Sequence, residues 1–495
     1  MFHAEHSNPT PVTIAAVPNP QEIFDAQRTA FHRCAPLPLE KRLEALGNLF
    51  QSVVNHQDEL IAAVSADFGH RSAHETRILE LFPLLDEIRF LKRHLRRWMR
   101  PRSVAANWQF LPSRARIIYQ PLGVVGVIGA WNYPTLLTLS PLANALAAGN
   151  HVIAKPSEHA PQTAEVVRRI VAAAFPENYV AVITGDKDVA SALCTLPFDH
   201  LLFTGSTSVG KLVMKAAAEN LTPVTLELGG KSPALVHESY SMATAADRIC
   251  SAKFWNAGQT CIAPDYALVP AHKRDEFISA CEAAIAKRYS NSSSNADYTH
   301  MISSSARDRM RELVDDARGR GASVIQPDSS EDTSANRSFP PTLITGVDDR
   351  MRIMHEEIFG PILPVVTYTS LNEALNFVNA RPRPLALYYF DGNRYRIRRV
   401  LDETTSGGAA INDCIFQFAQ HRLPFGGAGP SGMGAYHGFE GFKTFSKKKG
   451  IFLQSALAGS VLNILRPPYS PRTDLAIGLL LGRNKSRPVQ KITLP

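Results

Sequence analysis

The sequence is poor in cysteine and has no pair of cysteines at the close spacing of a metal knuckle or a redox motif. Its six cysteines stand at positions 34, 194, 250, 261, 281 and 414. Without a Cys-x-x-Cys pair, neither a zinc knuckle nor a thioredoxin-type motif is present, and no metal site is predicted. Such a set of separate thiols fits a reducing cytoplasm, where we expect the protein.

Long apolar runs are also missing. Residues 1–20 are polar and rich in proline, and they have no apolar core of signal-peptide length. The apolar stretch 475–481 is far too short to span a bilayer. A packed tail and a loose surface anchor both fit this stretch. We favour packing, and no membrane contact is expected.

The sequence has more positive than negative residues, but no motif indicates that this excess of positive charge binds nucleic acid. The net charge is +8, and many of the positive residues gather at 92–102. No aromatic-rich RNA-binding signature accompanies this cluster. The solvated face of a helix explains it, so no nucleic-acid partner is expected. The length of 495 residues and the 45% of hydrophobic residues predict a globular protein of about two to four domains.

The pattern of apolar residues predicts an α/β protein with two doubly wound parallel sheets. Residues 21–100 have helical spacing. Short apolar strands then alternate with helices, which is typical of a parallel sheet. The predicted strands of the first sheet are 124–128, 152–155, 180–183 and 201–203, with helices at 136–148, from 161, at 188–196 and at 209–218. Those of the second are 233–236, 267–269, 322–325 and 365–368, with helices at 274–289 and 304–319 and a solvated loop at 327–337.

Two further strands, 114–121 and 445–454, lie outside both sheets. Isolated ribbons are marginally stable, so we expect these strands to pair with each other or with another subunit. The predicted domains are residues 1–228, with N-terminal helices and a dinucleotide-binding fold, and residues 229–420, which carry the thiol described next. A return segment and arm cover 421–455 together with 101–121, and a tail covers 456–495.

Cys261 ends a run of small residues, Asn-Ala-Gly-Gln-Thr-Cys at 256–261, which suits a tight backbone path. An ordinary thiol, with a pKa of about 8.5, is only a few per cent thiolate at neutral pH. A backbone donor or a helix start beside it would raise that share. The other cysteines lack this setting, and Cys250 and Cys281 are predicted to be packing residues.

Two polar residues could assist such a thiol. Glu227 precedes Gly229 and Gly230, and in a cleft its carboxylate could accept a proton near neutrality. A solvated turn glutamate is the alternative. Asn132, in Trp-Asn-Tyr-Pro at 131–134, could donate to an oxyanion, or it could cap the next helix. The sequence leaves both alternatives open.

Several loops could bind a dinucleotide. The loop from Gly205 to Gly210 follows a strand and opens a helix, where backbone N–H groups attract phosphate. An ordinary strand-to-helix turn fits equally well, because the Gly-x-Gly-x-x-Gly spacing is absent. Lys155 and Glu158 flank a turn after a strand and could bind ribose hydroxyls. The pair Glu357 and Phe359 could hold a ribose and a flat ring, although ordinary turns remain possible for these segments and for the glycine-rich 423–427 and 431–434.

Taken in order, these motifs resemble the aldehyde dehydrogenase superfamily across residues 20–455. The matching segments are 131–134, 155–158, 203–206, 226–231, 258–261, 357–361 and 423–427. The segments at 221–225, 261–266, 382–389 and 431–438 look like the class 3 type, and 66–71 and 95–99 are similar to bacterial coniferyl aldehyde dehydrogenases. Ala130 departs from the threonine or proline of the family, with little expected consequence.

This resemblance implies roles for individual residues. Cys261 would attack an aldehyde, Asn132 with the Cys261 N–H would hold the oxyanion, and Glu227 would activate the water that hydrolyses the thioester. Hydride would pass to NAD or NADP. The residues that would contact the cofactor are Trp131, Lys155, Glu158, Gly205, Ser206, Gly210, Leu228, Glu357 and Phe359.

The resemblance also implies the aldehyde dehydrogenase fold with oligomerisation β-arms, and a homodimer. An aromatic aldehyde of the coniferyl type is the expected substrate. The alternative is a long-chain aliphatic aldehyde oxidised by a membrane-associated enzyme, which the apolar stretch 475–481 and the basic charge suggest. A protein that keeps the fold without turnover is a third possibility, against which the presence of Cys261, Glu227 and Asn132 argues.

Overall fold

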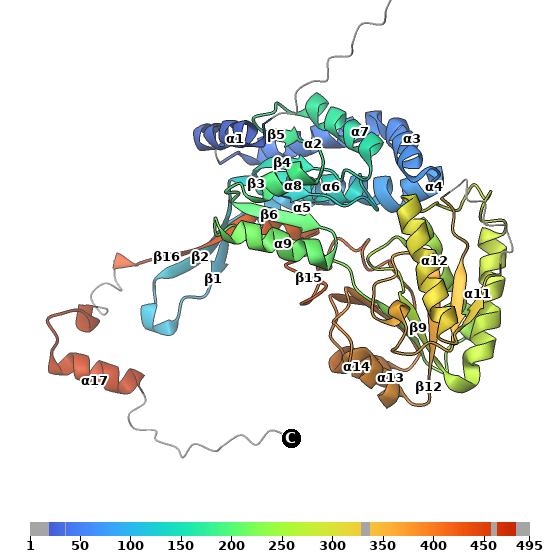
Figure 1. Cartoon of the computed structure of the whole chain (residues 1–495). Helices are drawn as coiled ribbons and strands as arrows, with labels where there is room; N and C mark the ends of the chain where they lie inside the picture. The colour runs from blue at the N-terminus through green and yellow to red at the C-terminus, as the bar shows by residue number, and fades with distance from the viewer. Residues whose placement is uncertain (1–18, 35, 328–336, 457–462, 482–495) are drawn as a thin grey trace, which may run out of the picture. The chain divides into compact units, whose positions relative to one another are not determined.

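A computed structural model describes residues 19–34, 36–327, 337–456 and 463–481 (Figure 1). The predicted loop at 327–337 therefore lies almost wholly outside the described residues. The chain divides into two compact units. The first comprises the residues up to 96 together with 121–446, and the second comprises 97–120 together with the residues from 447 onward.

The N-terminal part is helical, as predicted. Apolar side chains at helical spacing, among them Leu46, Leu49 and Val53, form a buried stripe. Gly69, with φ of +76°, ends one helix in the left-handed conformation that glycine adopts at little cost. The elements are α1 (Pro20–Cys34), α2 (Leu39–Asn55), α3 (Gln57–Phe68), α4 (Ala73–Thr76), the π-helical turn η1 (Arg77–Leu81) and α5 (Phe82–Trp98).

The first sheet has the strand order β15-β7-β6-β3-β4-β5. Its strands run parallel except β15, which is antiparallel to β7. The chain builds outward from β3 in both directions, so the topological switch point lies between β3 and β6. The strands are β3 (Val124–Ile128), β4 (His151–Lys155), β5 (Val180–Val182), β6 (His200–Thr204), β7 (Val224–Glu227) and β15 (Gly432–Met433). The helices are α6 (Leu136–Ala148), α7 (Pro161–Ala174), α8 (Lys187–Cys194) and α9 (Thr207–Ala218), and α15 (Gly438–Thr444) follows β15.

The second sheet has the order β10-β11-β12-β9-β8-β13-β14. One edge departs from the predicted parallel pattern, because β10 is antiparallel to β11. The strands are β8 (Pro233–Val236), β9 (Tyr266–Pro270), β10 (Ser323–Ile325), β11 (Thr342–Thr345), β12 (Ile362–Tyr368), β13 (Ala386–Phe390) and β14 (Gly408–Ile411). The helices are α10 (Met242–Phe254), α11 (Arg274–Tyr289), α12 (Ser304–Gly319), α13 (Leu371–Asn379) and α14 (Arg394–Glu403).

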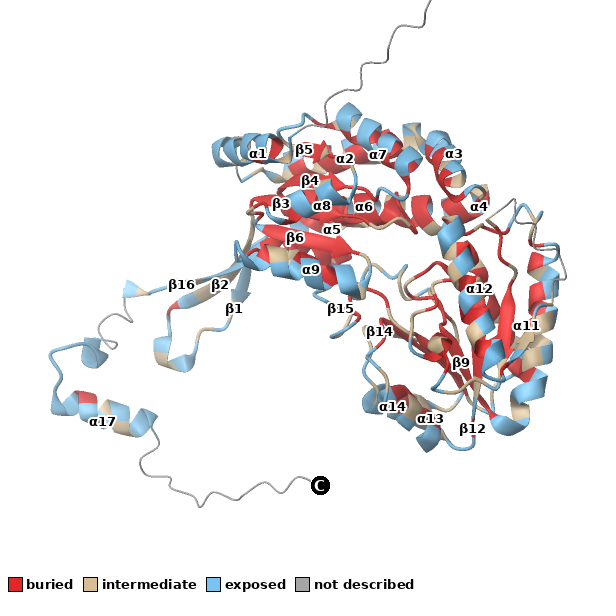
Figure 2. Cartoon of the chain, viewed as in Figure 1, coloured by how far each residue is buried: buried red, intermediate tan, exposed pale blue. Residues whose placement is uncertain are grey.

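Burial is concentrated in the two large sheets (Figure 2). Every residue of β3, β4, β6, β8, β9 and β13 is buried. Parallel strands covered by helices on both faces read as continuous apolar runs, which is why most of them could be predicted from the sequence. The domain boundaries themselves stay a prediction.

The second unit contains a three-stranded sheet of order β1-β2-β16. Its strands are β1 (Arg102–Val104), β2 (Arg114–Pro121) and β16 (Ser446–Leu453). The two strands predicted outside the main sheets, β2 and β16, therefore pair with each other. This was one of the two expected arrangements, the other being pairing with another subunit.

Helix α17 (Pro471–Leu480) contains most of the apolar stretch for which packing was favoured. Leu475, Leu479 and Leu481 are 69%, 73% and 75% exposed, so that expectation is wrong for these side chains. The sequence pattern could not reveal this, because an apolar run shows that burial is favourable and not that a partner is present. Among the described residues, no helix combines the length and the apolar character needed to cross a membrane.

Candidate active site

The thiol loop, residues 255–261, follows α10 and begins with the short helix η3 (Trp255–Gly258). Asn256 and Ala257 have φ of 53° and 50°, in the left-handed region that non-glycine residues adopt only at a cost. At Gly258, with φ of +73°, a side chain would collide with the carbonyl of Gly360. These constraints fix the backbone that carries Cys261, which is half-buried. The sequence predicted a tight path, and the structure has one.

Two cavities meet at this thiol. One has a volume of about 660 Å³, and the other, of about 180 Å³, is almost wholly apolar. The larger lies beyond the carboxyl ends of β3, β6 and β7, next to the switch point where ligands bind in open parallel sheets. Four residues line both cavities: Thr204, Glu227, Leu228 and Cys261. A group held in one cavity can therefore meet a group held in the other at Cys261.

Glu227 ends β7 and is buried with both carboxylate oxygens free of hydrogen-bond partners in the described part of the chain. Burial raises the pKa of Glu227 well above its usual value. The solvated-turn alternative is thus wrong for this residue. A buried carboxyl group with a raised pKa has the property required of a base that works near neutrality.

The same surroundings keep the Cys261 thiol protonated. Burial, followed by the nearby Glu357 and Glu227 carboxylates, raises the pKa of Cys261 to about 12. The backbone N–H groups of Cys261 and Ile262 oppose this rise but are outweighed. We expected a backbone donor beside the thiol to raise the thiolate fraction. Such donors are present and do lower the pKa of Cys261, but burial and the nearby negative charges raise it by more.

Asn132 lies against the thiol loop. Its Nδ2 donates to the carbonyl of Gln259 over 3.1 Å, and Asn256 Nδ2 donates to the Asn132 carbonyl over 3.0 Å. The helix-cap alternative is wrong, because the residue before α6 is Thr135. Glu80 instead accepts hydrogen bonds from the first backbone N–H groups, that of Thr135 over 2.8 Å.

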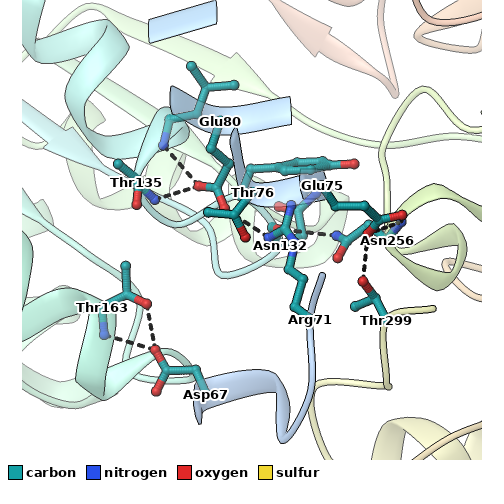
Figure 3. A network of polar contacts seen from close by, with 12 residues as sticks. Asp67, Arg71, Glu75, Thr76, Glu80, Asn132, Thr135, Thr163, Asn256 and Thr299 are labelled. Carbon is teal, nitrogen blue, oxygen red and sulfur yellow. Dashed lines mark hydrogen bonds and ion pairs between the residues drawn. The ribbon is translucent and has the colours of Figure 1, made fainter. Parts of the chain in front are cut away.

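A buried polar network supports both loops (Figure 3). Arg71 forms an ion pair of 2.8 Å with Glu80, and both side chains are fully buried. Arg71 also donates to the Asn132 carbonyl over 3.4 Å. Glu75 accepts hydrogen bonds from the Asn256 N–H, at 3.2 Å to its Oε2, and from the Thr299 hydroxyl over 2.5 Å.

The sequence interpretation did not find these supporting residues. The available signal was a set of charged side chains at 71, 75 and 80 within a region predicted to be helical. Charges on a helix are usually solvated, and so their burial could not be inferred.

Seven of the nine residues predicted to contact a cofactor line the larger cavity. They are Trp131, Glu158, Gly205, Ser206, Leu228, Glu357 and Phe359. Lys155 and Gly210 are not part of this lining. Lys155 is buried and donates to Glu158 Oε2 over 2.8 Å, and a side chain at Gly210 would approach Leu228 to 2.8 Å.

The lining fits a dinucleotide. A side chain at position 205 would meet the Phe203 ring, and glycine avoids this contact. Ser206 caps the start of α9, where free N–H groups attract phosphate. Glu357 is half-buried, and its pKa is raised to about 8 by burial and by Asp265, with the Gly230 N–H, Lys231 and Lys253 opposing the rise. Phe359 and Trp131 pack edge to face with their ring centroids 5.4 Å apart.

Four of the five remaining cysteines fit packing roles, and the fifth, Cys34, is exposed. Cys250 and Cys281 are fully buried, as predicted, and Cys194 and Cys414 are buried as well. Across the described ranges there is no group of three or more His, Cys, Asp or Glu side chains that could hold a metal ion.

Comparisons with known proteins agree with this geometry. Residues 10–451 match the model of the aldehyde dehydrogenase family. The chain is 48% identical over 452 residues to the "Probable coniferyl aldehyde dehydrogenase" of Pseudomonas aeruginosa, covering 91% of this chain and 94% of the relative.

Two solved structures show the same fold. The substrate-bound AldH of Staphylococcus aureus has a TM-score of 0.87 and 36% identity, and the match covers 93% of this chain and 99% of that one. The betaine aldehyde dehydrogenase of Staphylococcus aureus in complex with NAD+, a point mutant, has a TM-score of 0.80 and 27% identity, covering 88% and 90%. The predicted fold class is thereby confirmed. The chain belongs to the aldehyde dehydrogenase family.

Proposed function

We propose that the protein oxidises an aldehyde to its carboxylate with NAD(P)+ through a covalent intermediate on Cys261. The observation that carries the proposal is the position of Cys261 and Glu227 at the junction of the two cavities. The apolar cavity suits the organic part of an aldehyde, and the larger cavity suits a dinucleotide. NAD(P)+, when bound there, supplies the acceptor for the hydride that leaves the substrate carbon.

The side chains would divide the remaining work. Cys261 Sγ forms a bond to the aldehyde carbon, and Glu227, whose raised pKa suits proton acceptance, takes up the thiol proton. Asn132 Nδ2 and the Cys261 N–H stabilise the negative oxygen, a contribution of about 3–4 kcal/mol for one such donor. After oxidation, Glu227 releases the thiol proton to solvent and then, as a carboxylate again, removes a proton from the water that hydrolyses the thioester.

The cofactor would be held by the residues of the larger cavity. Glu357 and Phe359 would bind next to the reacting end, and Gly205 and Ser206 next to the phosphates. Glu158 would bind the adenosine ribose, with Lys155 positioning its carboxylate. A carboxylate at this place favours an unphosphorylated ribose, so we expect NAD to be preferred to NADP.

The proposed substrate is an aromatic aldehyde of the coniferyl type. Support comes from the 48% identity to the Pseudomonas aeruginosa relative and from the aromatic side chains of the smaller cavity, among them Tyr133, Trp255 and Phe418. The test is a panel of aldehydes assayed with both cofactors for NAD(P)H formation. A clear preference for coniferaldehyde with NAD is expected, and no NAD(P)H with any aldehyde would refute the proposal.

A membrane-associated enzyme for long-chain aliphatic aldehydes is the second candidate. The exposed leucines of α17 favour it, as do the half-exposed apolar side chains of Ile78, Phe82 and Phe416 along the smaller cavity. A higher kcat/KM for a long-chain aldehyde than for coniferaldehyde would select this candidate.

A homodimer and a cytoplasmic location complete the proposal. The sheet β1-β2-β16 ends in two edge strands, and edges of this kind can add strands from another subunit. The six cysteines are free thiols, which fits a reducing compartment. The molar mass in solution, measured by light scattering, would reveal a monomer if the dimer is wrong.

A further inference from the structure

The small apolar cavity contains three buried polar groups with no partner in the described part of the chain. They are the carboxylate of Glu227 and the hydroxyls of Thr204 and Tyr436. Tyr133, in the same lining, differs because its hydroxyl lies 2.6 Å from that of Thr260. Buried polar groups in folded proteins nearly always have partners, and bound water is a common one. Glu227 already has a place in the proposed reaction, whereas Tyr436 has none.

The backbone holds Tyr436 close to the strand that carries Glu227. Gly432 on β15 is paired with Glu227 on β7. Four residues later, the Tyr436 N–H donates to the Phe425 carbonyl over 2.8 Å, and the Phe425 N–H donates back over 3.2 Å. The Tyr436 ring is fully buried and packs edge to face against Phe425. Its hydroxyl therefore has a fixed place in the wall of the cavity.

On the basis of the proposed function, we propose that Tyr436 is a further catalytic residue, whose phenol oxygen holds the hydrolytic water for Glu227. The water donates one O–H to the Glu227 carboxylate and the other to the Tyr436 oxygen. Its lone pair then faces the thioester carbon on Cys261. As the new C–O bond forms, Glu227 takes the first proton. The tetrahedral intermediate then breaks its C–S bond, which releases the carboxylic acid and the Cys261 thiolate.

The charge state of Tyr436 suits this role. Burial raises its pKa well above the usual value, and the Glu227 carboxylate adds to the rise. The phenol consequently stays neutral, so that it orients the water without competing with Glu227 for the proton. Two contacts to one water also fix its direction of attack. A water held by a single carboxylate would be free to rotate.

The test measures the lifetime of the acyl-enzyme without any cofactor. p-Nitrophenyl acetate is used to acetylate Cys261, and intact-protein mass spectrometry follows the loss of the acetyl group. Tyr436→Phe removes one oxygen and keeps the ring, and it should lengthen this lifetime about tenfold or more. Tyr368→Phe is the matched control, since its hydroxyl donates to the Val236 carbonyl over 2.7 Å within the second sheet. This control should match the parent lifetime.

A second comparison separates the role in hydrolysis from one in substrate binding. Glu227→Gln should also lengthen the lifetime, and adding Tyr436→Phe to it should lengthen it little further, because both act on one water. An unchanged lifetime in Tyr436→Phe would overturn the inference, as would a change confined to KM for phenolic aldehydes. If the parent protein oxidises no aldehyde, the proposed function fails instead, so the two failures are distinguishable.

Discussion

Asn256 Nδ2 donates a 3.0 Å hydrogen bond to the main-chain carbonyl of Asn132, which joins the thiol loop to the loop of the proposed oxyanion donor. The same Nδ2 lies 3.1 Å from the Gln259 carbonyl, which also accepts from Asn132 Nδ2. One buried amide thus contacts both the loop of the nucleophile and the loop of the donor and helps to fix their relative position. Asn256→Ala should lower kcat about tenfold or more and leave KM for NAD nearly unchanged, because Asn256 does not line the larger cavity.

Asn19→Ala is a suitable control for that change. Its side chain makes an exposed contact with Glu22 near the N-terminus, so its kinetic parameters should match those of the parent. Steady-state kinetics at saturating aldehyde checks both variants. An equal loss of kcat and of NAD affinity in Asn256→Ala would indicate general disorder of the site and contradict the positioning role.

The buried ion pair between Arg71 and Glu80 gives a prediction about stability. Arg71→Met would leave the Glu80 carboxylate without its cation in the interior, a change that costs about 3–5 kcal/mol. Arg168→Met removes one partner of an exposed pair with Glu165 and should cost less than about 1 kcal/mol. Urea unfolding followed by circular dichroism measures both. Equal losses in the two variants would show that the buried pair has no special weight.

The pKa of Cys261 predicts the pH dependence of its alkylation. With a pKa of about 12, the thiol of the cofactor-free enzyme is neutral near pH 7, and its thiolate fraction grows about tenfold per pH unit. The rate of reaction with iodoacetamide should therefore rise without a plateau up to pH 9. A plateau near neutrality would contradict the raised pKa.

Removal of a carboxylate near the thiol should speed that alkylation. Two negatively charged carboxylates raise the pKa of Cys261, and Glu357 has the larger effect of the two. Glu357→Gln therefore lowers this pKa and increases the thiolate fraction. Glu165→Gln changes an exposed carboxylate and is the matched control, with the parent rate expected. The comparison uses cofactor-free protein at pH 9, where the Glu357 carboxyl group, with a pKa of about 8, is mostly ionised. Slower alkylation in Glu357→Gln would have the wrong sign.

The binding of the cofactor should depend on the ionisation of Glu357. Its pKa is about 8, so the carboxyl group is mostly protonated at pH 6.5 and mostly ionised at pH 9. An ionised carboxylate accepts stronger hydrogen bonds from ribose hydroxyls. The Kd for NAD, measured by calorimetry, should fall as pH rises through 8. In Glu357→Gln the dependence should flatten, and an unchanged slope in that variant would assign it to another group.

Much of the fold could be predicted from the sequence, because buried parallel strands are continuous apolar runs. β3 and β6 were predicted for this reason, within one or two residues of their observed ends. Strand β14 was missed because its Gly-Ala-Ala-Ile sequence has little strand propensity. Strand β15 has two residues and exists only through its pairing with β7. Pairing between distant segments leaves no periodic signal in either of them.

The site shows the same division. Cys261, Glu227 and Asn132 could be identified because each lies in a distinctive local motif. Glu80 and Glu75 could not, because their partners Thr135 and Asn256 lie 55 and 181 positions away. Tyr436 was missed because a lone tyrosine after a glycine-rich turn resembles any packing residue.

The most direct test of the proposed chemistry replaces one sulfur atom. Cys261→Ser and Cys34→Ser, the latter at an exposed cysteine, are compared with the parent protein for NAD(P)H formation with coniferaldehyde. The proposed mechanism predicts that Cys261→Ser loses at least about a thousandfold in kcat, while Cys34→Ser keeps the parent rate. Turnover of Cys261→Ser at the parent rate would contradict it.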